Sequence, residues 1–319
     1  MTPEQANEAV LRGAVGAAAR LMRDLDDELP TARDRLRQLF PHTGRAHVIG
    51  VTGAPGPGKS SLIDQLIAGY RAQGQTVGVV AIDPSSPFGG GAILGDRIRM
   101  QRHADDPGVF VRSVATRGHL GGLSRSTGDI VDVMDAMGKD RILVETVGVG
   151  QDEIEIMRLA HTTLVLQVPG LGDDVQAIKA GLLEIANNFV VNKADLDGAD
   201  RVAGELAAML ATRTAGRPLP AIVQVQAHQG RGIGELLAAI ERHRAQAAAT
   251  TPALQRQRLE RRFLDHLRDA LFLQGRDRLT ASGAYGRIVD ALAARALDPW
   301  SAALEAAAVL RGDQGGPGV

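Results

Sequence analysis

The segment that most constrains the fold of this chain is Gly53-Ala54-Pro55-Gly56-Pro57-Gly58-Lys59-Ser60. It matches the pattern G-x-x-x-x-G-K-[S/T]. An apolar run at 48–51 precedes it, and Ser61 and apolar residues at helical spacing follow. The pattern in this setting predicts a strand, a phosphate-binding loop (P-loop) and a helix, in that order. The alternative is a glycine- and proline-rich turn that only happens to precede a helix.

Each residue type in the P-loop has a physical reason. Glycines let backbone N–H groups turn toward an anionic phosphate without side-chain clashes, and the helix N-terminus adds a partial positive charge. We expect Lys59 to reach the β- and γ-phosphates and the Ser60 hydroxyl to ligate Mg²⁺. The segment therefore predicts a nucleoside triphosphate as ligand, with Mg²⁺ as cofactor.

Composition narrows the class of protein. The chain has 319 residues, a formal net charge of −1 and no cysteine. Its length suits one large α/β domain with appendages, or two domains. The near-zero charge gives no electrostatic case for nucleic acid or an anionic membrane as partner. The N-terminus lacks a signal-peptide pattern and no apolar run could span a bilayer, so we expect a cytoplasmic protein.

Runs rich in β-branched residues alternate with helical patterns through the middle of the chain. The candidate strands are 46–52, 76–82, 108–113, 141–146, 162–168, 187–192 and 221–225. Such alternation predicts an α/β fold of the P-loop NTPase type, with a doubly wound and mostly parallel sheet. In such a sheet the ligand-binding loops follow the carboxyl ends of the strands.

Acidic residues follow several of these strands. Asp83 and Asp96 lie in a glycine-rich connection after the second strand, where they are candidate Mg²⁺ or water ligands. An Asp-Pro turn and a helix N-cap are the ordinary alternatives. Glu145 closes the fourth strand three residues before Gly148, a spacing that places a carboxylate near Mg²⁺ and an N–H near the γ-phosphate. Gln151 is a candidate for orienting the attacking water, although it stands three residues beyond Gly148.

The base of the nucleotide is indicated by Asn192, Lys193 and Asp195, which form N-K-x-D at a strand end. A carboxylate there can accept hydrogen bonds from N1–H and the exocyclic amine of guanine, a donor pair that adenine lacks. This predicts GTP and GDP as ligands. GTPases often have Ser-Ala after the next strand, whereas this chain has Gln226 and Ala227. Backbone contacts to the base could survive that difference.

Two further loops each allow two interpretations of their function. In 116–123, His119 lies among glycines, and either a ligand contact or a flexible loop accounts for it. In 169–179, Asp173 could simply cap a helix. The isolated Lys179 is one of only four lysines in the chain, and with the paired acids Asp173 and Asp174 it suggests a charged switch.

Helical segments flank the central region. Residues 1–40 carry helical patterning, with Leu11, Val15, Ala18, Leu21 and Met22 on one face. Residues 254–275 predict an amphipathic helix with Leu259, Phe263, Leu267 and Leu271 in line, and more helix follows at 284–310. Trp300, the only tryptophan, is a candidate interface anchor. We expect an N-terminal helical extension (1–44), a GTPase domain (45–250), a helical dimerisation arm (251–311) and a disordered tail (312–319).

The long motifs together resemble one family. They are G-A-P-G-P-G-K-S at 53–60, D-P-S-S-P at 83–87, G-A-I-L-G-D-R-I-R-M at 91–100, T-R-G-H-L-G-G-L at 116–123 and E-T-V-G-V-G-Q at 145–151. The resemblance is to the MeaB/MMAA-type GTPases, also labelled ArgK or arginine/ornithine transport ATPases, and it runs from the N-terminal helices through the C-terminal arm.

That resemblance implies a G-protein chaperone of an adenosylcobalamin-dependent acyl-CoA mutase, with an adenosyltransferase as a further possible partner. By position it implies that Asp83, Asp96 and Glu145 surround the metal and the hydrolytic water. It also implies a switch at 170–180, with Asp173, Asp174, Gln176 and Lys179, that communicates with the mutase, and a homodimer formed through the C-terminal arm. Two other readings remain open: a kinase or transport-coupled ATPase acting on a small acceptor, and a GTP-dependent scaffold.

Overall fold

A computed structural model describes residues 2–83, 101–115, 126–146, 156, 158–170, 186–212, 219–248 and 251–312. The chain divides into two compact units, Met1–Ala248 and Ala249–Val319.

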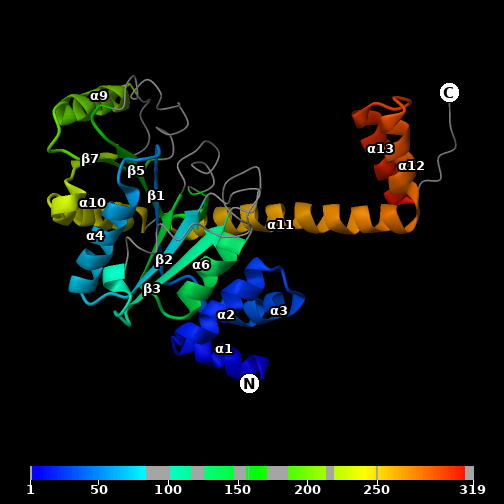
Figure 1. Ribbon diagram of the computed structural model, residues 1–319, viewed down its shortest axis with the longest axis horizontal. Helices are drawn as coiled ribbons and strands as arrows, with labels where there is room; N and C mark the ends of the chain where they lie inside the picture. Colours follow the sequence, from blue (N-terminus) through cyan, green and yellow to red (C-terminus); the bar gives the residue numbers. More distant parts are fainter. Residues whose placement is uncertain are drawn as a thin grey trace. The chain divides into compact units, whose positions relative to one another are not determined.

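The first unit is built on a seven-stranded sheet in which every pairing is parallel. The strands are β1 (His47–Gly53), β2 (Val77–Asp83), β3 (Val109–Ala115), β4 (Arg141–Glu145), β5 (Thr162–Gln167), β6 (Asn188–Val191) and β7 (Ala221–Gln224). Their order across the sheet is β3-β2-β4-β1-β5-β6-β7 (Figure 1). All the predicted strands are present, and the prediction of a parallel α/β fold is confirmed.

Helices cover both faces of this sheet (Figure 1). Helices α4 (Lys59–Ala72) and α10 (Ile233–Ala247) pack on one face, where their side chains share a buried cluster with Val51 and Leu164. Helices α6 (Ser126–Ala136) and α9 (Ala199–Ala211) pack on the other face. Strand residues alternate between these two clusters because successive side chains point to opposite faces. Their near-continuous apolar sequence reflects burial on both sides.

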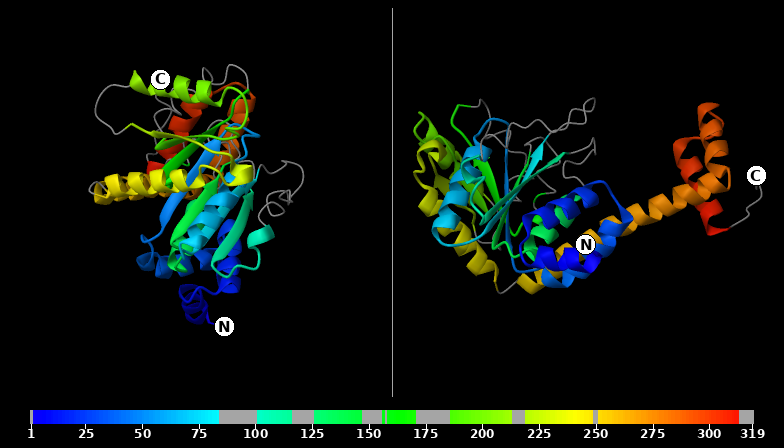
Figure 2. Two further views of the ribbon diagram at one scale, coloured as in Figure 1. Left: turned by 90° about the vertical axis from the view of Figure 1, so that its left-hand side faces the viewer. Right: turned by 60° about the horizontal axis from the view of Figure 1, so that its bottom comes forward.

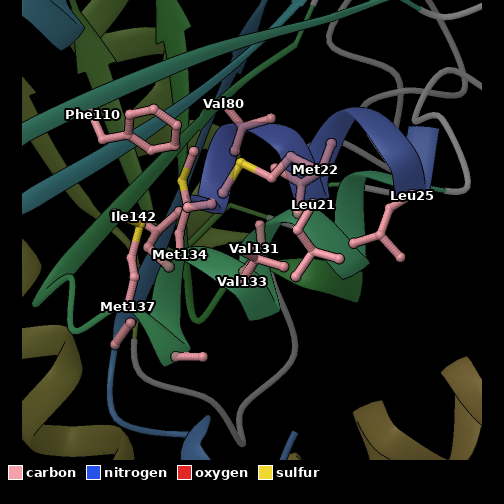
Figure 3. Close-up of a cluster of buried hydrophobic side chains, with 14 of the residues drawn as sticks. Leu21, Met22, Leu25, Val80, Phe110, Val131, Val133, Met134, Met137 and Ile142 are labelled. Atoms are coloured by element: carbon pink, nitrogen blue, oxygen red, sulfur yellow. The ribbon is translucent and has the colours of Figure 1, made fainter. Parts of the chain in front are cut away.

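Three helices precede the sheet and pack on α6. They are α1 (Pro3–Leu11), α2 (Val15–Asp26) and α3 (Pro30–Leu39). Leu21, Met22 and Leu25 of α2 join Met134 and Val131 of α6 in one buried cluster (Figure 3). The N-terminal helices are therefore part of the same compact unit as the sheet.

The apolar face expected for residues 1–40 was partly wrong. Ala18, Leu21 and Met22 are buried, whereas Leu11 is 36% and Val15 45% exposed. The reason is that the pattern is interrupted by a turn, since α1 ends at Leu11 and α2 starts at Val15. Each helix therefore orients its own face, and the residues beside the turn belong to neither.

The link from this helical region into β1 is fixed by one carboxylate. Asp135 of α6 accepts backbone N–H groups from Gly44 (2.7 Å), Arg45 (3.2 Å) and Ala46 (3.1 Å). The residue is buried, so these bonds satisfy a carboxylate that would otherwise be costly to bury. The entry of the chain into the central strand is thereby defined.

The second unit contains α11 (Thr251–Ala281), α12 (Ala284–Ala293) and α13 (Pro299–Arg311) (Figure 2). Helix α11 extends beyond the predicted 254–275 at both ends. Leu279, Ala284, Ile288 and Ala302 are buried where the three helices meet. Among the described residues no helix is both long and apolar enough to cross a membrane.

Candidate nucleotide-binding site

The P-loop follows the central strand β1, which is paired with β4 on one side and β5 on the other. Gly53 has φ 143°, and a Cβ there would lie 2.5 Å from the carbonyl oxygen of Leu166. Gly58 has φ 87°, and a Cβ there would lie 2.6 Å from Nδ2 of Asn192. Both positions therefore require glycine, for the turn itself and for the close approach of β5 and the loop after β6.

Lys59 is held inside the loop. The residue is buried, and its Nζ donates to the carbonyl oxygens of Gly53 (2.9 Å) and Ala54 (3.0 Å). A buried ammonium is stable only when such oxygens surround it. The same position at the start of α4 places the positive charge at the helix N-terminus, where backbone N–H groups also favour an anion. The arrangement suits a phosphate group.

Ser60 and Glu145 meet beside the P-loop. The Ser60 hydroxyl donates to Oε1 of Glu145 at 2.8 Å, and both residues are buried. Glu145 closes β4 and is in register with Val51 of β1, two residues before Gly53. A hydroxyl and a carboxylate are oxygen ligands of the kind that Mg²⁺ prefers. The donor set of these two residues therefore fits the expected metal ion.

Asn192 joins the loops that follow β1, β6 and β7. Its Nδ2 donates to the carbonyl oxygen of Pro57 at 2.7 Å, and its Oδ1 accepts the N–H of Ala227 at 3.0 Å. Lys193 adds a longer contact from Nζ to the Gly56 carbonyl oxygen (3.4 Å). One side chain thus ties the P-loop to the loops that follow β6 and β7.

The predicted base-contacting residues lie around this link. Asp195 is exposed, so its carboxylate is open to a ligand. The N–H of Gln226 donates to the Arg231 carbonyl oxygen at 3.0 Å, which fixes the loop just before Ala227. Lys193 has φ 54°, a conformation that a non-glycine residue seldom adopts and that is common at binding sites.

A model of the family described as methylmalonyl Co-A mutase-associated GTPase MeaB matches residues 18–278. The chain belongs to the MeaB family of GTPases. The family's activity, GTP hydrolysis, agrees with the P-loop, with the Ser60–Glu145 pair and with N-K-x-D at the end of β6.

Several members of the MeaB family and one solved structure are similar over long stretches. A protein of Pyrococcus abyssi described as a GTPase is 45% identical over 302 residues, covering 93% of each chain. GTPase ArgK of Escherichia coli is 40% identical over 210 residues, 64% of this chain and 63% of that protein. The mouse methylmalonic aciduria type A homolog is 36% identical over 193 residues, 59% of this chain and 46% of that protein. A crystal structure of a LAO/AO transport system kinase superposes with TM-score 0.70 at 25% identity, covering 97% of this chain and 98% of that one.

Part of the predicted site lies outside the residues that the structure describes. Asp83 ends β2, but its side chain is not described. The other predicted residues outside the described ranges are Asp96, His119, Gly148, Gln151, Asp173, Asp174, Gln176 and Lys179. Their roles remain predictions.

Two features of this site were not predicted from the sequence. Asn192 was assigned to the base, and the contact with Pro57 in the P-loop became visible only in the structure. Thr52 and Thr146, which bond to each other where β1 and β4 end, were also not singled out. The available signal was the threonine that ends each of the two predicted strands, 46–52 and 141–146.

Proposed function

We propose that this chain binds GTP with Mg²⁺ and, through hydrolysis, controls the loading, protection or reactivation of adenosylcobalamin in an acyl-CoA mutase of the methylmalonyl-CoA type. The observation that carries the proposal is the match of the MeaB family model to residues 18–278. The P-loop and the N-K-x-D loop support a nucleotide-dependent switch. The family description names methylmalonyl-CoA mutase and so indicates the kind of partner.

In this proposal each residue of the chain has one task. The P-loop amides from Gly53 to Ser61 and the Lys59 ammonium hold the phosphates, and Asp195 with the backbone of Gln226 and Ala227 holds guanine. Ser60 holds Mg²⁺, with Glu145, Asp83 and Asp96 close to it directly or through water. The metal ion, when bound, neutralises charge that develops on the phosphates. Gln151 orients the attacking water, and the Gly148 N–H meets the γ-phosphate.

The switch is expected to report to partners elsewhere on the chain. Asp173, Asp174, Gln176 and Lys179 are proposed to contact the mutase. The second unit is proposed to form a homodimer, and an adenosyltransferase is a further candidate partner. Slow hydrolysis alone and faster hydrolysis with the mutase follow from this scheme, because a switch must persist until its partner responds.

Base specificity can be tested separately from the partner. Asp195→Asn replaces an acceptor-only carboxylate by an amide, which suits the oxygen at C2 of xanthine better than the amine of guanine. We expect GTP affinity to fall roughly a hundredfold and XTP affinity to rise, since leaving a polar group without its partner costs about 1–3 kcal/mol. Asp197→Asn, on the same exposed loop, is the matched control. Unchanged GTP affinity in the Asp195 variant would remove guanine reading from this residue.

A phosphotransfer role is the competing function, because the similar solved structure is described as a transport system kinase. Competition between GTP and ATP for the purified protein separates the two. Preference for ATP, or phosphate appearing on an acceptor other than water, would favour the kinase. We expect GTP and GDP to bind far more tightly than ATP.

A further inference from the structure

Two buried threonines face each other where β1 and β4 end. Their Oγ1 atoms lie 2.9 Å apart, and Thr52 is 0% and Thr146 1% exposed. The N–H of Thr146 also donates to the Val51 carbonyl oxygen at 3.1 Å. This pairing continues the β1–β4 register one residue beyond Glu145. Thr146 is therefore held to β1 by both its backbone and its side chain.

The threonine pair lies on the face of the sheet opposite to Ser60. Val51 and Leu143 pack in the cluster on the α4 side, and Val144 packs in the cluster on the α6 side. Because side chains alternate along a strand, Glu145 points to the α4 side, where it meets Ser60, and Thr146 points away. The hydrogen bond between the two hydroxyls thus fixes the backbone of the residue that directly follows Glu145.

Packing alone does not account for two hydroxyls at this place. Valine has the same branched shape and suits a strand equally well. The two hydroxyls carry two protons but share one bond, and no second acceptor for them is found among the described residues. Replacing both partners of a buried hydrogen bond by apolar groups of the same shape is often neutral or stabilising. What a valine pair would lack is a directional bond between the strand ends.

We propose that Thr146, through its hydrogen bond to Thr52, is a positioning residue for GTP hydrolysis. It fixes the carboxyl end of β4 so that Glu145 keeps its place against Ser60 when the nucleotide and Mg²⁺ are bound. The inference rests on the proposed role of Glu145 beside the metal ion. It assigns a function to two residues whose side chains point to the face of the sheet opposite to Ser60.

The test uses the full chain, GTP and Mg²⁺, with steady-state hydrolysis as the readout. Thr146→Val should lower kcat about tenfold while KM for GTP changes less than twofold, because misplacing a group at the reacting centre affects the transition state more than ground-state binding. The Mg²⁺ concentration for half-maximal rate should rise. Thr146→Ser, which restores the hydroxyl, should recover most of the rate.

The partner threonine supplies a second readout. Thr52→Val should match Thr146→Val, and the double variant should be no slower than either, because both substitutions remove the same bond. The control is Thr163→Val. Thr163 is a buried threonine near the amino end of β5, away from the carboxyl ends of the strands, and its substitution should leave kcat unchanged. Equal rates for the valine and serine variants at 146, or effects at 52 and 146 that multiply, would overturn the inference.

Glu145→Gln separates this inference from the proposed function. If the Glu145→Gln variant hydrolyses GTP slowly while the Thr146→Val variant hydrolyses it at the normal rate, only the positioning role of Thr146 fails. If Glu145→Gln hydrolyses GTP as fast as the unaltered protein, the assigned role of Glu145 fails and the inference fails with it. Circular dichroism and urea denaturation of each variant establish that the fold is retained.

Discussion

At the scale of single residues, Asn192 shows what a motif can and cannot specify. The N-K-x-D pattern located a base-binding loop, because its chemistry depends on local sequence. The hydrogen bonds of Asn192 to Pro57 and Ala227 join segments 135 and 35 residues away in the chain. No local pattern contains that information, since it depends on the order β1-β5-β6-β7 in the sheet.

Asn192→Ala should weaken GDP and GTP binding tenfold to a hundredfold, because it leaves the Pro57 carbonyl and the Ala227 N–H without their partner and releases both loops. Titration calorimetry measures the change. The matched control is Asn187→Ala, since Asn187 bonds to the backbone of Thr163 and, within the part of the chain that the structure describes, to no residue of the P-loop or the N-K-x-D loop. Equal affinity for the unaltered protein and the Asn192 variant would contradict the account of Asn192 as the link.

A second prediction at this scale concerns His47, at the start of β1. Burial lowers the pKa of His47 to about 2, and positive charge at His161, Arg141, Arg244 and His243 acts in the same direction. The unfolded chain takes up a proton at this residue below pH 6.5, and the folded chain does not. The free energy of unfolding should therefore fall by about 1.4 kcal/mol per pH unit as the pH drops below 6.5.

His47→Gln should flatten that slope, since the glutamine amide does not titrate and can replace the bond of His47 to Thr162, which is 2.9 Å long. Urea denaturation at pH 5, 6, 7 and 8 measures the slopes. His42→Gln, at an exposed histidine, should keep the slope of the unaltered protein. A His47 variant with the same slope as that protein would show that another group dominates.

At the scale of elements, the strands were predictable because burial on both faces of a parallel sheet leaves runs of β-branched residues. The helical conformation of residues 1–40 was predictable. Their division into three helices, each with its own buried face, was not. Leu11 and Val15 satisfy the helical spacing, yet they lie on either side of the turn at 12–14 and stay exposed. The position of a turn decides which residues of a periodic pattern share a face.

Met22→Ala should destabilise the first unit by about 3 kcal/mol, because it opens a cavity between α2 and α6. Val15→Ala, at the exposed first residue of α2, should change the free energy of unfolding by less than about 0.5 kcal/mol. Urea denaturation compares the two. Equal effects would mean that α2 is not fixed on α6 as described.

At the scale of the whole molecule, the second unit leaves the predicted apolar stripe of α11 uncovered. Leu259, Phe263, Leu267 and Leu271 are between 38% and 60% exposed, and Trp300 is 73% exposed. Contiguous exposed apolar surface of this kind is typical of an interface. Homodimerisation through this unit remains a proposal. The sequence predicts it from the same line of apolar residues on α11.

The double variant Phe263→Glu/Leu271→Glu should weaken self-association at least a hundredfold, since each substitution removes a large apolar side chain and buries a charge. Sedimentation velocity measures the stoichiometry, and emission from Trp300 should shift to longer wavelength if that residue lies in the interface. Arg268→Ala, at an exposed charged position on the same helix, is the control. A monomeric unaltered protein would contradict the dimer.

We propose that GTP hydrolysis by this chain serves an adenosylcobalamin-dependent mutase. The most direct measurement is the rate of phosphate release from GTP and Mg²⁺ by the full chain, alone and with purified methylmalonyl-CoA, isobutyryl-CoA or hydroxyacyl-CoA mutase. Lys59→Ala is the control for the contribution of the P-loop. We expect slow hydrolysis by the chain alone, at least tenfold acceleration by one of these mutases, and no activity in the Lys59 variant. Identical rates with and without every one of these mutases would contradict the proposal that GTP hydrolysis by this chain serves a mutase.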